Sequence, residues 1–300
     1  MNLPLAIDNF LASHLVSPRE VTPLAVVDCD GTIIKGDIGE AMFYFQIERF
    51  LFRESPGTLW PDYPDRKELD RLFNSLVQNP PFIGSQDGRQ IAFANHLLDW
   101  YFAQLKAGQT MKACADIVRL WSGFREAEVV EVARDTVKAE LAPGPEERLL
   151  GKHLLPRGVG YIKETREMLE RIRAVGFNTW VVSGSNVWSV REICRHLPVA
   201  PTQIAGISLG RKGDLISSQV LHPVPVNEGK VDLLKAKGFP QPMIVVSNSI
   251  LDLPLYKHCR GLKVLVQSDH HADGFFDRAG IQPDDSWVVI TQPTVERASS

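Results

Sequence analysis

The feature that most constrains the fold is an apolar run that ends in two acidic residues. Residues 24–27 read Leu-Ala-Val-Val, and residues 28–32 follow as Asp-Cys-Asp-Gly-Thr. Short apolar runs of this kind are typical of buried strands in a parallel sheet. The carboxyl end of such a strand faces the crevice where open α/β sheets bind ligands. Carboxylates there are costly to desolvate unless a cation or a reaction uses them, so we expect Asp28 and Asp30 to lie in a functional site.

The second half of the chain alternates between strand patterns and helix patterns. Its apolar runs predict strands over residues 177–182, 203–207, 243–246, 263–266 and 287–290. Amphipathic spacing between these runs predicts helices, and residues 209–221 read as a small hairpin. This alternation predicts an α/β fold with a doubly wound, Rossmann-like parallel sheet.

A long stretch without strand patterns separates the first strand from this alternating half. Residues 67–141 have helical spacing throughout, and Pro143 begins the turn that ends them. We therefore expect an α/β core formed by residues 1–38 and 155–300. Residues 39–154 are expected to form an inserted, all-helical cap domain that determines substrate specificity.

Composition and charge exclude several classes of function. The 300-residue chain has a net charge of −3, which gives no basic surface for nucleic acid or an anionic membrane. No apolar run approaches about 20 residues, so no transmembrane helix is expected. Residues 1–16 lack the features of a signal peptide. The 4 cysteines show no CxxC spacing, which is typical of reduced thiols in a cytoplasmic protein.

Two further apolar runs end in polar residues, as the first one does. Ser183 follows one run, Asn248 and Asp252 follow another, and Lys230 lies in the helix before the latter. Because the carboxyl ends of parallel strands share one edge of a sheet, these side chains are expected to meet the two acids. Such oxygen ligands suit Mg²⁺, which can bridge to a substrate phosphate. A carboxylate can attack phosphorus, and a second acid can protonate the leaving alcohol.

Four motifs in this order resemble those of the haloacid dehalogenase superfamily: Asp28-x-Asp30-Gly31-Thr32, Ser183-Gly184, Gly229-Lys230 and Asn248-Ser-x-x-Asp252. The chain is most similar to the phosphoserine-phosphatase-like branch, in which a helical C1-type cap follows the first strand. The resemblance implies a Rossmann-like core, a mobile cap, and Mg²⁺-dependent transfer of phosphate to water.

The resemblance also implies residue roles. Asp28 resembles the nucleophile, and Asp30 resembles the general acid and base. The positions that resemble phosphate-binding residues are Thr32, Ser183, Gly184 and Lys230. The positions that resemble the Mg²⁺ site are Asp28, Asp30, Asn248 and Asp252. Asn248 departs from the family, which commonly has Asp there, so weaker Mg²⁺ binding is expected.

Two acids, Asp37 and Glu40, follow the first motif at the expected joint between core and cap. They read equally well as solvated linker residues or as contacts to a cationic group of the substrate. In phosphoserine phosphatases an acid near the position of Asp37 resembles the contact to the substrate amine. The aromatic residues of the cap could instead cage a quaternary ammonium, although helical spacing favours a core role for Trp60, Trp100, Tyr101 and Trp121.

The sequence therefore predicts a Mg²⁺-dependent phosphomonoesterase that acts on a small phosphorylated metabolite through an aspartyl-phosphate. A cationic amine on that metabolite is one option. A dehalogenase is disfavoured, because dehalogenases usually lack the second acid, here Asp30. A catalytically weak or inactive protein that binds a phosphorylated ligand or partner remains an alternative because of Asn248. Specificity depends on the cap, where the motifs give no information.

Overall fold

A computed structural model of the chain describes residues 3–14, 22–80, 87–268 and 272–296. Residues 269–273 resemble a metal cluster by composition, but the sequence favours a solvated loop; of these residues, 269–271 lie outside the described part of the chain. Among the described residues, no helix is both long and apolar enough to cross a membrane.

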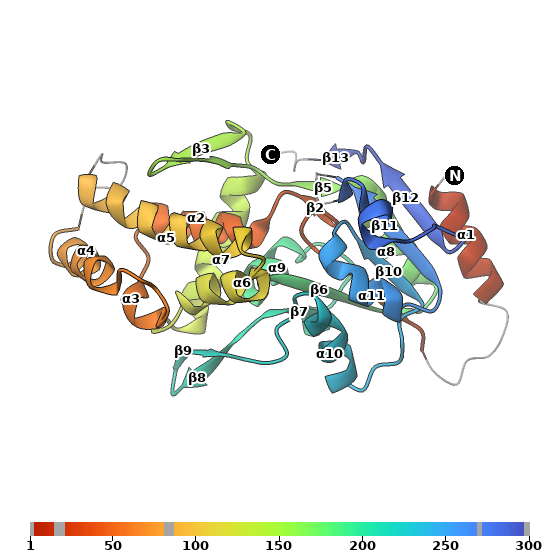
Figure 1. Cartoon of the computed structure of the whole chain (residues 1–300). Coiled ribbons are helices and arrows are strands. Elements are labelled where there is room, and N and C mark those ends of the chain that lie inside the picture. Colours follow the sequence, from red (N-terminus) through yellow and green to blue (C-terminus); the bar gives the residue numbers. More distant parts are fainter. Residues whose placement is uncertain (1–2, 15–21, 81–86, 269–271, 297–300) are drawn as a thin grey trace.

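A six-stranded parallel sheet forms the centre of one half of the molecule (Figure 1). Its order is β12 (Trp287–Thr291), β11 (Leu262–Gln267), β10 (Ile244–Ser247), β1 (Leu24–Val27), β6 (Asn178–Asn186) and β7 (Ile204–Ile207). Val27 pairs with Val246 on one side and with Val181 on the other. The predicted α/β fold is confirmed, and this register places the ends of β10, β1 and β6 next to one another.

Alternate side chains of each strand point to opposite faces of the sheet, so an apolar run makes both faces apolar. Helices cover both of them. Ala25 and Val27 pack in a cluster with α1 (Leu3–His14), α8 (Lys163–Ala174) and α9 (Val187–Ile193). Leu24 and Val26 pack in another with α10 (Glu228–Ala236), α11 (Leu253–His258) and α12 (Phe275–Ala279). The short 3₁₀ turns Pro201–Gln203 and Ile250–Asp252 precede β7 and α11. The sheet is therefore buried on both faces, as the apolar runs predict.

A small antiparallel sheet fixes the turn that follows β1. It contains β2 (Ile34–Lys35), β5 (Gly160–Ile162) and β13 (Val295–Glu296). Within the turn, the backbone N–H groups of Ile33 and Ile34 both donate to the carbonyl of Cys29. These bonds close the acidic turn, and the N–H of Ile162 on β5 donates to the carbonyl of Ile33 at 2.9 Å, which attaches the turn to the small sheet.

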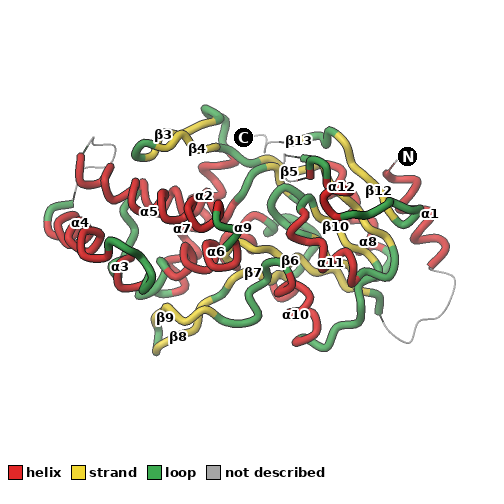
Figure 2. Tube along the Cα trace, in the orientation of Figure 1, coloured by secondary structure: helices red, strands yellow, loops and turns green. Residues whose placement is uncertain are grey.

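The other half of the molecule consists mainly of helices, which we call the helical part (Figure 2). It contains α2 (Ile38–Glu48), α3 (Pro56–Leu59), α4 (Arg66–Gln78), α5 (Gly88–Lys106), α6 (Thr110–Arg119) and α7 (Glu126–Leu141). The structure differs from the all-helical expectation at β3 (Glu147–Leu150) and β4 (His153–Pro156), which form a hairpin. Each strand is only four residues long, too short for its alternation to be recognised. The division into residues 1–38, 39–154 and 155–300 stays a prediction.

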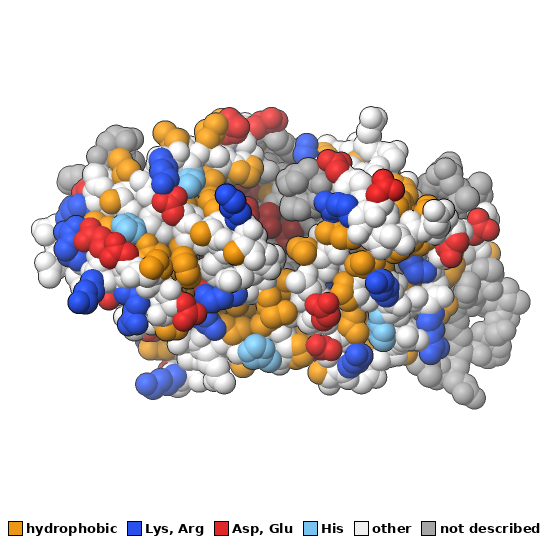
Figure 3. All heavy atoms as spheres, viewed as in Figure 1, with side chains coloured by type: hydrophobic (Ala, Val, Ile, Leu, Met, Phe, Trp, Pro, Cys, Tyr) orange, Lys and Arg blue, Asp and Glu red, His pale blue; other side chains and the backbone are white. Residues whose placement is uncertain are grey.

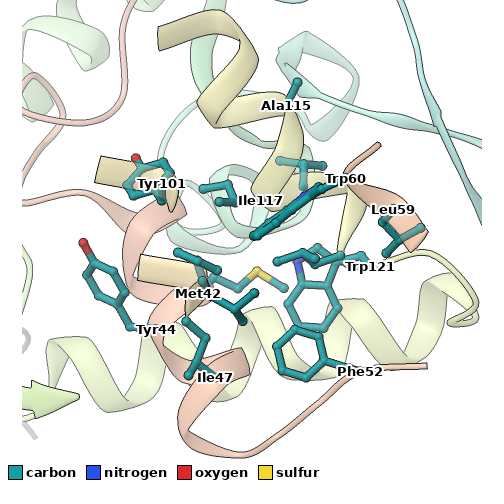
Figure 4. Packing of buried hydrophobic residues seen from close by; sticks show 14 of the residues in the cluster. Met42, Tyr44, Ile47, Phe52, Leu59, Trp60, Tyr101, Ala115, Ile117 and Trp121 are labelled. Carbon is teal, nitrogen blue, oxygen red and sulfur yellow. The ribbon is translucent and has the colours of Figure 1, made fainter. Parts of the chain in front are cut away.

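The helical part has its own apolar core, which extends onto the α/β half. Trp60 and Trp121 lie at its centre, close to Met42 and Phe52 (Figure 4). The same cluster includes Trp188 of α9 and side chains of the predicted hairpin, which is confirmed as β8 (Leu209–Lys212) and β9 (Leu215–Val220). The helical part is therefore joined to the sheet by continuous apolar packing.

Candidate active site

Three buried charged side chains meet where β1 and β10 end. The Nζ atom of Lys230 lies 2.8 Å from Oδ1 of Asp28 and 2.7 Å from Oδ2 of Asp252. The exposed fractions of the three residues are 4%, 7% and 2%. Oγ of Ser247 donates a further hydrogen bond to Asp252 at 2.5 Å. The ammonium thus compensates two carboxylates that would be very costly to bury alone.

Local backbone structure explains why these groups meet. The N–H of Asp28 donates to the carbonyl of Val246 at 2.9 Å, which continues the pairing of β1 with β10 beyond the strand. Lys230 lies in the first turn of α10. A Cβ atom at the preceding Gly229 would lie only 1.8 Å from the carbonyl oxygen of Val224. Only glycine therefore lets α10 begin so close to this loop and direct Lys230 into the site.

The carboxylate of Asp30 is held by three donors from two elements. Its Oδ1 accepts from the N–H of Ile38, in the first turn of α2, at 2.8 Å. Its Oδ2 accepts from Oγ of Ser183 at 3.0 Å and from Oγ of Ser185 at 2.8 Å. Asp30 is therefore fixed between the start of the helical part and the end of β6.

The other residues of the predicted phosphate and metal sites surround this pair. Oγ1 of Thr32 donates to Oδ1 of Asn248 at 3.3 Å, and both residues are buried. Ser183 is fully buried and also accepts from the N–H of Ser185 at 3.0 Å. Gly184 lines the cavity described below. The structure thus brings all the predicted residues together. Thr32 and Ser183 lie behind the residues that line the cavity.

Asp37 and Glu40 lie at the start of α2. Asp37 caps the helix and accepts from the N–H of Glu40 at 2.8 Å. The two carboxylate oxygens of Glu40 accept from Oη of Tyr44 and Oη of Tyr101, each at 2.8 Å. These two tyrosines lie at one edge of the apolar core (Figure 4). Neither acid forms an ion pair with another described residue, so their charges are uncompensated.

A cavity of about 440 Å³ lies between the α/β half and the helical part. Figure 3 shows a hollow near the middle of the molecule with acidic side chains at its bottom. The acids that line the cavity are Asp28, Asp30, Asp37, Glu40 and Asp252. Its lysines are Lys35 and Lys230. The lining therefore carries more negative than positive charge.

Burial of this negative charge changes the acidity of the site. Burial raises the pKa of Asp28 to about 7, although Lys230 opposes the increase. Burial also raises the pKa of Asp30, against the opposing hydrogen bonds from Ile38 and the two serines. Asp37 is exposed, but desolvation by the surrounding cavity walls and the nearby charges of Asp30 and Glu40 raise its pKa well above the ordinary value. A metal ion, a proton or a cationic ligand would relieve this excess.

The donor set suits a hard cation. Asp28 and Asp252 offer carboxylate oxygens and Asn248 an amide oxygen, which are the ligand types that Mg²⁺ takes. The raised pKa of Asp28 indicates a carboxylate that lacks sufficient positive charge around it. No group of three or more His, Cys, Asp or Glu side chains in the described part of the chain is placed to hold a metal. The neutral Asn248 is thus needed to complete the set.

Some residues of the site were not predicted from the sequence. Ser185 binds Asp30 and lines the cavity. The sequence does indicate Ser185, because residues two apart on a strand point to the same face and Ser185 lies two residues after Ser183. Tyr44 and Tyr101 bind Glu40, and Tyr101 reaches it only through the packing of α5 on α2. The aromatic residues of the helical part pack as core: Nε1 of Trp60 donates to the carbonyl of Asp116 at 2.9 Å.

The fold and the site together define a Rossmann-like α/β protein with a large helical insertion and a carboxylate-rich site at the end of its first strand. The sequence model of the haloacid dehalogenase-like hydrolases matches residues 90–257. The chain belongs to this family and is a hydrolase. No curated protein sequence matches the chain.

Solved structures support the same fold. A functionally unknown protein from Anaerococcus prevotii has 16% identity and a TM-score of 0.64, covering 88% of this chain and 85% of its own. A protein of unknown function from Bordetella pertussis has 14% identity and a TM-score of 0.57, covering 90% and 99%. A phosphoserine phosphatase, solved as an analogue of its phospho-aspartyl intermediate, has 13% identity and a TM-score of 0.43, covering 85% and 91%. At these identities the first two similarities establish the fold alone.

Proposed function

We propose that this hydrolase is a Mg²⁺-dependent phosphomonoesterase that acts on a small phosphorylated metabolite through an aspartyl-phosphate. The main supporting observation is the buried contact of Lys230 with Asp28 and Asp252, at 2.8 and 2.7 Å. This contact lies beside Asp30 in a cavity of small-molecule size. A nucleophilic carboxylate, a second acid and a fixed cation are the groups that this reaction needs.

In the first step, a carboxylate oxygen of Asp28 attacks phosphorus, and the bond between phosphorus and the ester oxygen breaks. Asp30 gives its proton to the leaving oxygen, which departs as an alcohol. The raised pKa of Asp30 favours the protonated acid that this step requires. Lys230, which contacts Asp28 at the turn formed by residues 28–32, stabilises the charge of the transferring phosphoryl group. Thr32, Ser183 and Gly184 shape that turn and its neighbour on β6.

In the second step, water attacks phosphorus of the aspartyl-phosphate. Asp30, now deprotonated, takes a proton from this water, and the bond between phosphorus and the Asp28 oxygen breaks. Inorganic phosphate leaves and the carboxylate of Asp28 is restored. The three hydrogen bonds to Asp30 keep it in one position for both proton transfers.

Mg²⁺ would be held by Asp28, Asn248 and Asp252, and it would supply positive charge next to the substrate phosphate. The side chain of Asp30 is a weaker ligand candidate, because three donors already bind its carboxylate. With an amide in place of a third carboxylate, we expect the affinity for Mg²⁺ to be low.

The substrate is proposed to carry a cationic amine. Asp37 and Glu40 line the cavity without an ion-pair partner among the described residues. The hydroxyls of Tyr44 and Tyr101 both donate to Glu40, which fixes the orientation of its carboxylate. An ammonium group bound here would offset the negative charge of Glu40, which is partly buried. The four cysteines form no disulfide, which supports our proposal of a reducing, cytoplasmic location.

Replacing the nucleophile tests the proposal. Asp28→Asn should abolish Mg²⁺-dependent hydrolysis of p-nitrophenyl phosphate, while the matched variant Asp232→Asn, on the exposed face of α10, should keep wild-type activity. Near-normal turnover by Asp28→Asn would refute the mechanism.

The neutral Asn248 favours one second candidate, a phospho-ligand-binding protein with little turnover. Binding of inorganic phosphate without ester hydrolysis at saturating Mg²⁺ would support that candidate instead.

A further inference from the structure

The cavity has two chemically different walls. Its floor carries the charged residues of the α/β half, whereas the helical part lines it with mostly apolar side chains. These come from α2, α5, α6 and the turn after α6: Phe43, Tyr101, Leu105, Cys114, Ile117, Val118 and Trp121. Pro225 and Val226 extend the apolar lining on the side of the α/β half. We call the lining from the helical part together with these two residues the apolar wall.

The cavity offers little to bind a carboxylate. Among the described residues that line it, none is Arg or His, and the only cations are Lys35 and Lys230. Lys230 is already bound to Asp28 and Asp252, and Lys35 is exposed. A carboxylate on the carbon that bears the amine would lie beside Glu40 as well, where like charges repel. The cavity therefore disfavours an acidic amino alcohol such as serine as the leaving group.

From these two observations, and resting on the proposed function, we propose that the substrate is the phosphate ester of an amino alcohol that bears an apolar group and no carboxylate. The phosphate lies at Asp28 and Lys230, and the ammonium lies toward Glu40. The apolar group lies against the apolar wall between Leu105 and Trp121. A volume of about 440 Å³ accommodates all three parts.

Part of the apolar wall also belongs to the core of the helical part. Val118 and Trp121, for example, are 2% exposed and pack in its cluster. Leu105 is the most informative position, because it is only partly buried and packs at the margin of that cluster. A polar side chain there changes the chemistry of the cavity with little loss of core packing.

Three esters that differ at one carbon test the proposal. They are 2-aminoethyl phosphate and its derivatives with a carboxylate (phosphoserine) or a benzyl group (phosphorylated phenylalaninol) at the amine-bearing carbon. We expect kcat/KM for the benzyl ester to exceed that for 2-aminoethyl phosphate by about tenfold or more, the scale of apolar discrimination in a pocket. Phosphoserine should be about tenfold poorer than 2-aminoethyl phosphate, because its carboxylate lies beside the carboxylate of Glu40.

A pair of variants links this preference to the apolar wall. Leu105→Asn should lose most of the benzyl preference, measured as the ratio of kcat/KM for the benzyl ester to kcat/KM for 2-aminoethyl phosphate. Leu149→Asn, at a β3 position that is 71% exposed and outside the cavity lining, should keep the preference. Hydrolysis of all three esters at equal rates, or best hydrolysis of phosphoserine, would overturn this inference alone. No hydrolysis of these esters or of p-nitrophenyl phosphate would overturn the proposed function, and this inference with it.

Discussion

Replacing Lys230 with Met should strongly destabilise the metal-free protein at neutral pH. The ammonium of Lys230 contacts Asp28 and Asp252 at 2.8 and 2.7 Å, and all three residues are less than a tenth exposed. Met keeps much of the side-chain volume and removes the charge. The change leaves two neighbouring buried carboxylates with no cation between them, and Asp252 then keeps only its bond from Ser247.

The size of the effect follows from the burial of the pair. Removing one partner of a buried ion pair costs roughly 3–5 kcal/mol, because the remaining charge is neither solvated nor compensated. Lys230 opposes the burial-driven increase in the pKa of Asp28, so its loss raises that pKa further. The variant can recover stability by protonating Asp28. We therefore expect the destabilisation to be largest near pH 8 and to shrink toward pH 5.

Urea unfolding followed by tryptophan fluorescence at pH 5 and pH 8, with EDTA, measures this effect. Lys235→Met is the control, because Lys235 lies on the same helix, is 64% exposed and makes only a 3.9 Å surface contact with Asp232; its change should stay within about 1 kcal/mol. Saturating Mg²⁺ should recover more stability for Lys230→Met than for wild type, since the ion replaces the lost charge. A Lys230→Met protein as stable as Lys235→Met at pH 8 would refute the charge-compensation argument.

Two further predictions concern the same carboxylates. Activity on p-nitrophenyl phosphate should disappear with EDTA and return with Mg²⁺. Asn248→Asp should lower the Mg²⁺ concentration for half-maximal activity by about tenfold, because a third carboxylate strengthens the site. An unchanged Mg²⁺ dependence would exclude Asn248 as a ligand. Burial raises the pKa of Asp28 from 3.8 to about 7, so the folded metal-free protein favours the protonated acid. The contribution of protonated Asp28 to the stability of the folded state is fully present below about pH 4 and is lost as the pH rises through about 7. At about 1.4 kcal/mol per pH unit, wild type should lose up to about 4 kcal/mol across this window relative to Asp28→Asn, and parallel urea-unfolding curves for the two proteins would contradict the prediction.

The sequence was sufficient for the sheet and for the residues at its edge. Apolar runs of four to six residues can be satisfied in few ways, and parallel strands bring their carboxyl ends together. For this reason the sequence alone places Asp28 at the same edge of the sheet as Asn248 and Asp252, although more than 200 residues separate it from them. Lys230 followed because it opens the helix that leads into β10.

The contacts of the helical part could not be predicted in the same way. Tyr101 reaches Glu40 across 61 residues, and no periodicity states which face of α5 packs on which face of α2. The amphipathic pattern of a helix shows that a side chain is buried but not what it contacts. The sequence therefore left Asp37 and Glu40 equally open as linker acids or substrate contacts, although the structure places both of them in the cavity.

Gly39 shows this limit most clearly and gives a final test. Nothing in the sequence distinguishes it from a linker glycine, yet a Cβ atom there would lie 2.3 Å from Oγ of Ser185. The hydroxyl of Ser185 and the N–H of Ile38 both bind Asp30, so Gly39→Ala must displace either Ser185 or the start of α2, and with it at least one donor to the proposed general acid. A displacement of about 1 Å can lower activity by up to about 100-fold, so we expect a large fall in kcat with little loss of stability. Gly88→Ala, at the start of α5 with no atom within 4 Å of its added Cβ, should be neutral or slightly stabilising. If both variants kept wild-type kcat, the contact between α2 and β6 would not position Asp30.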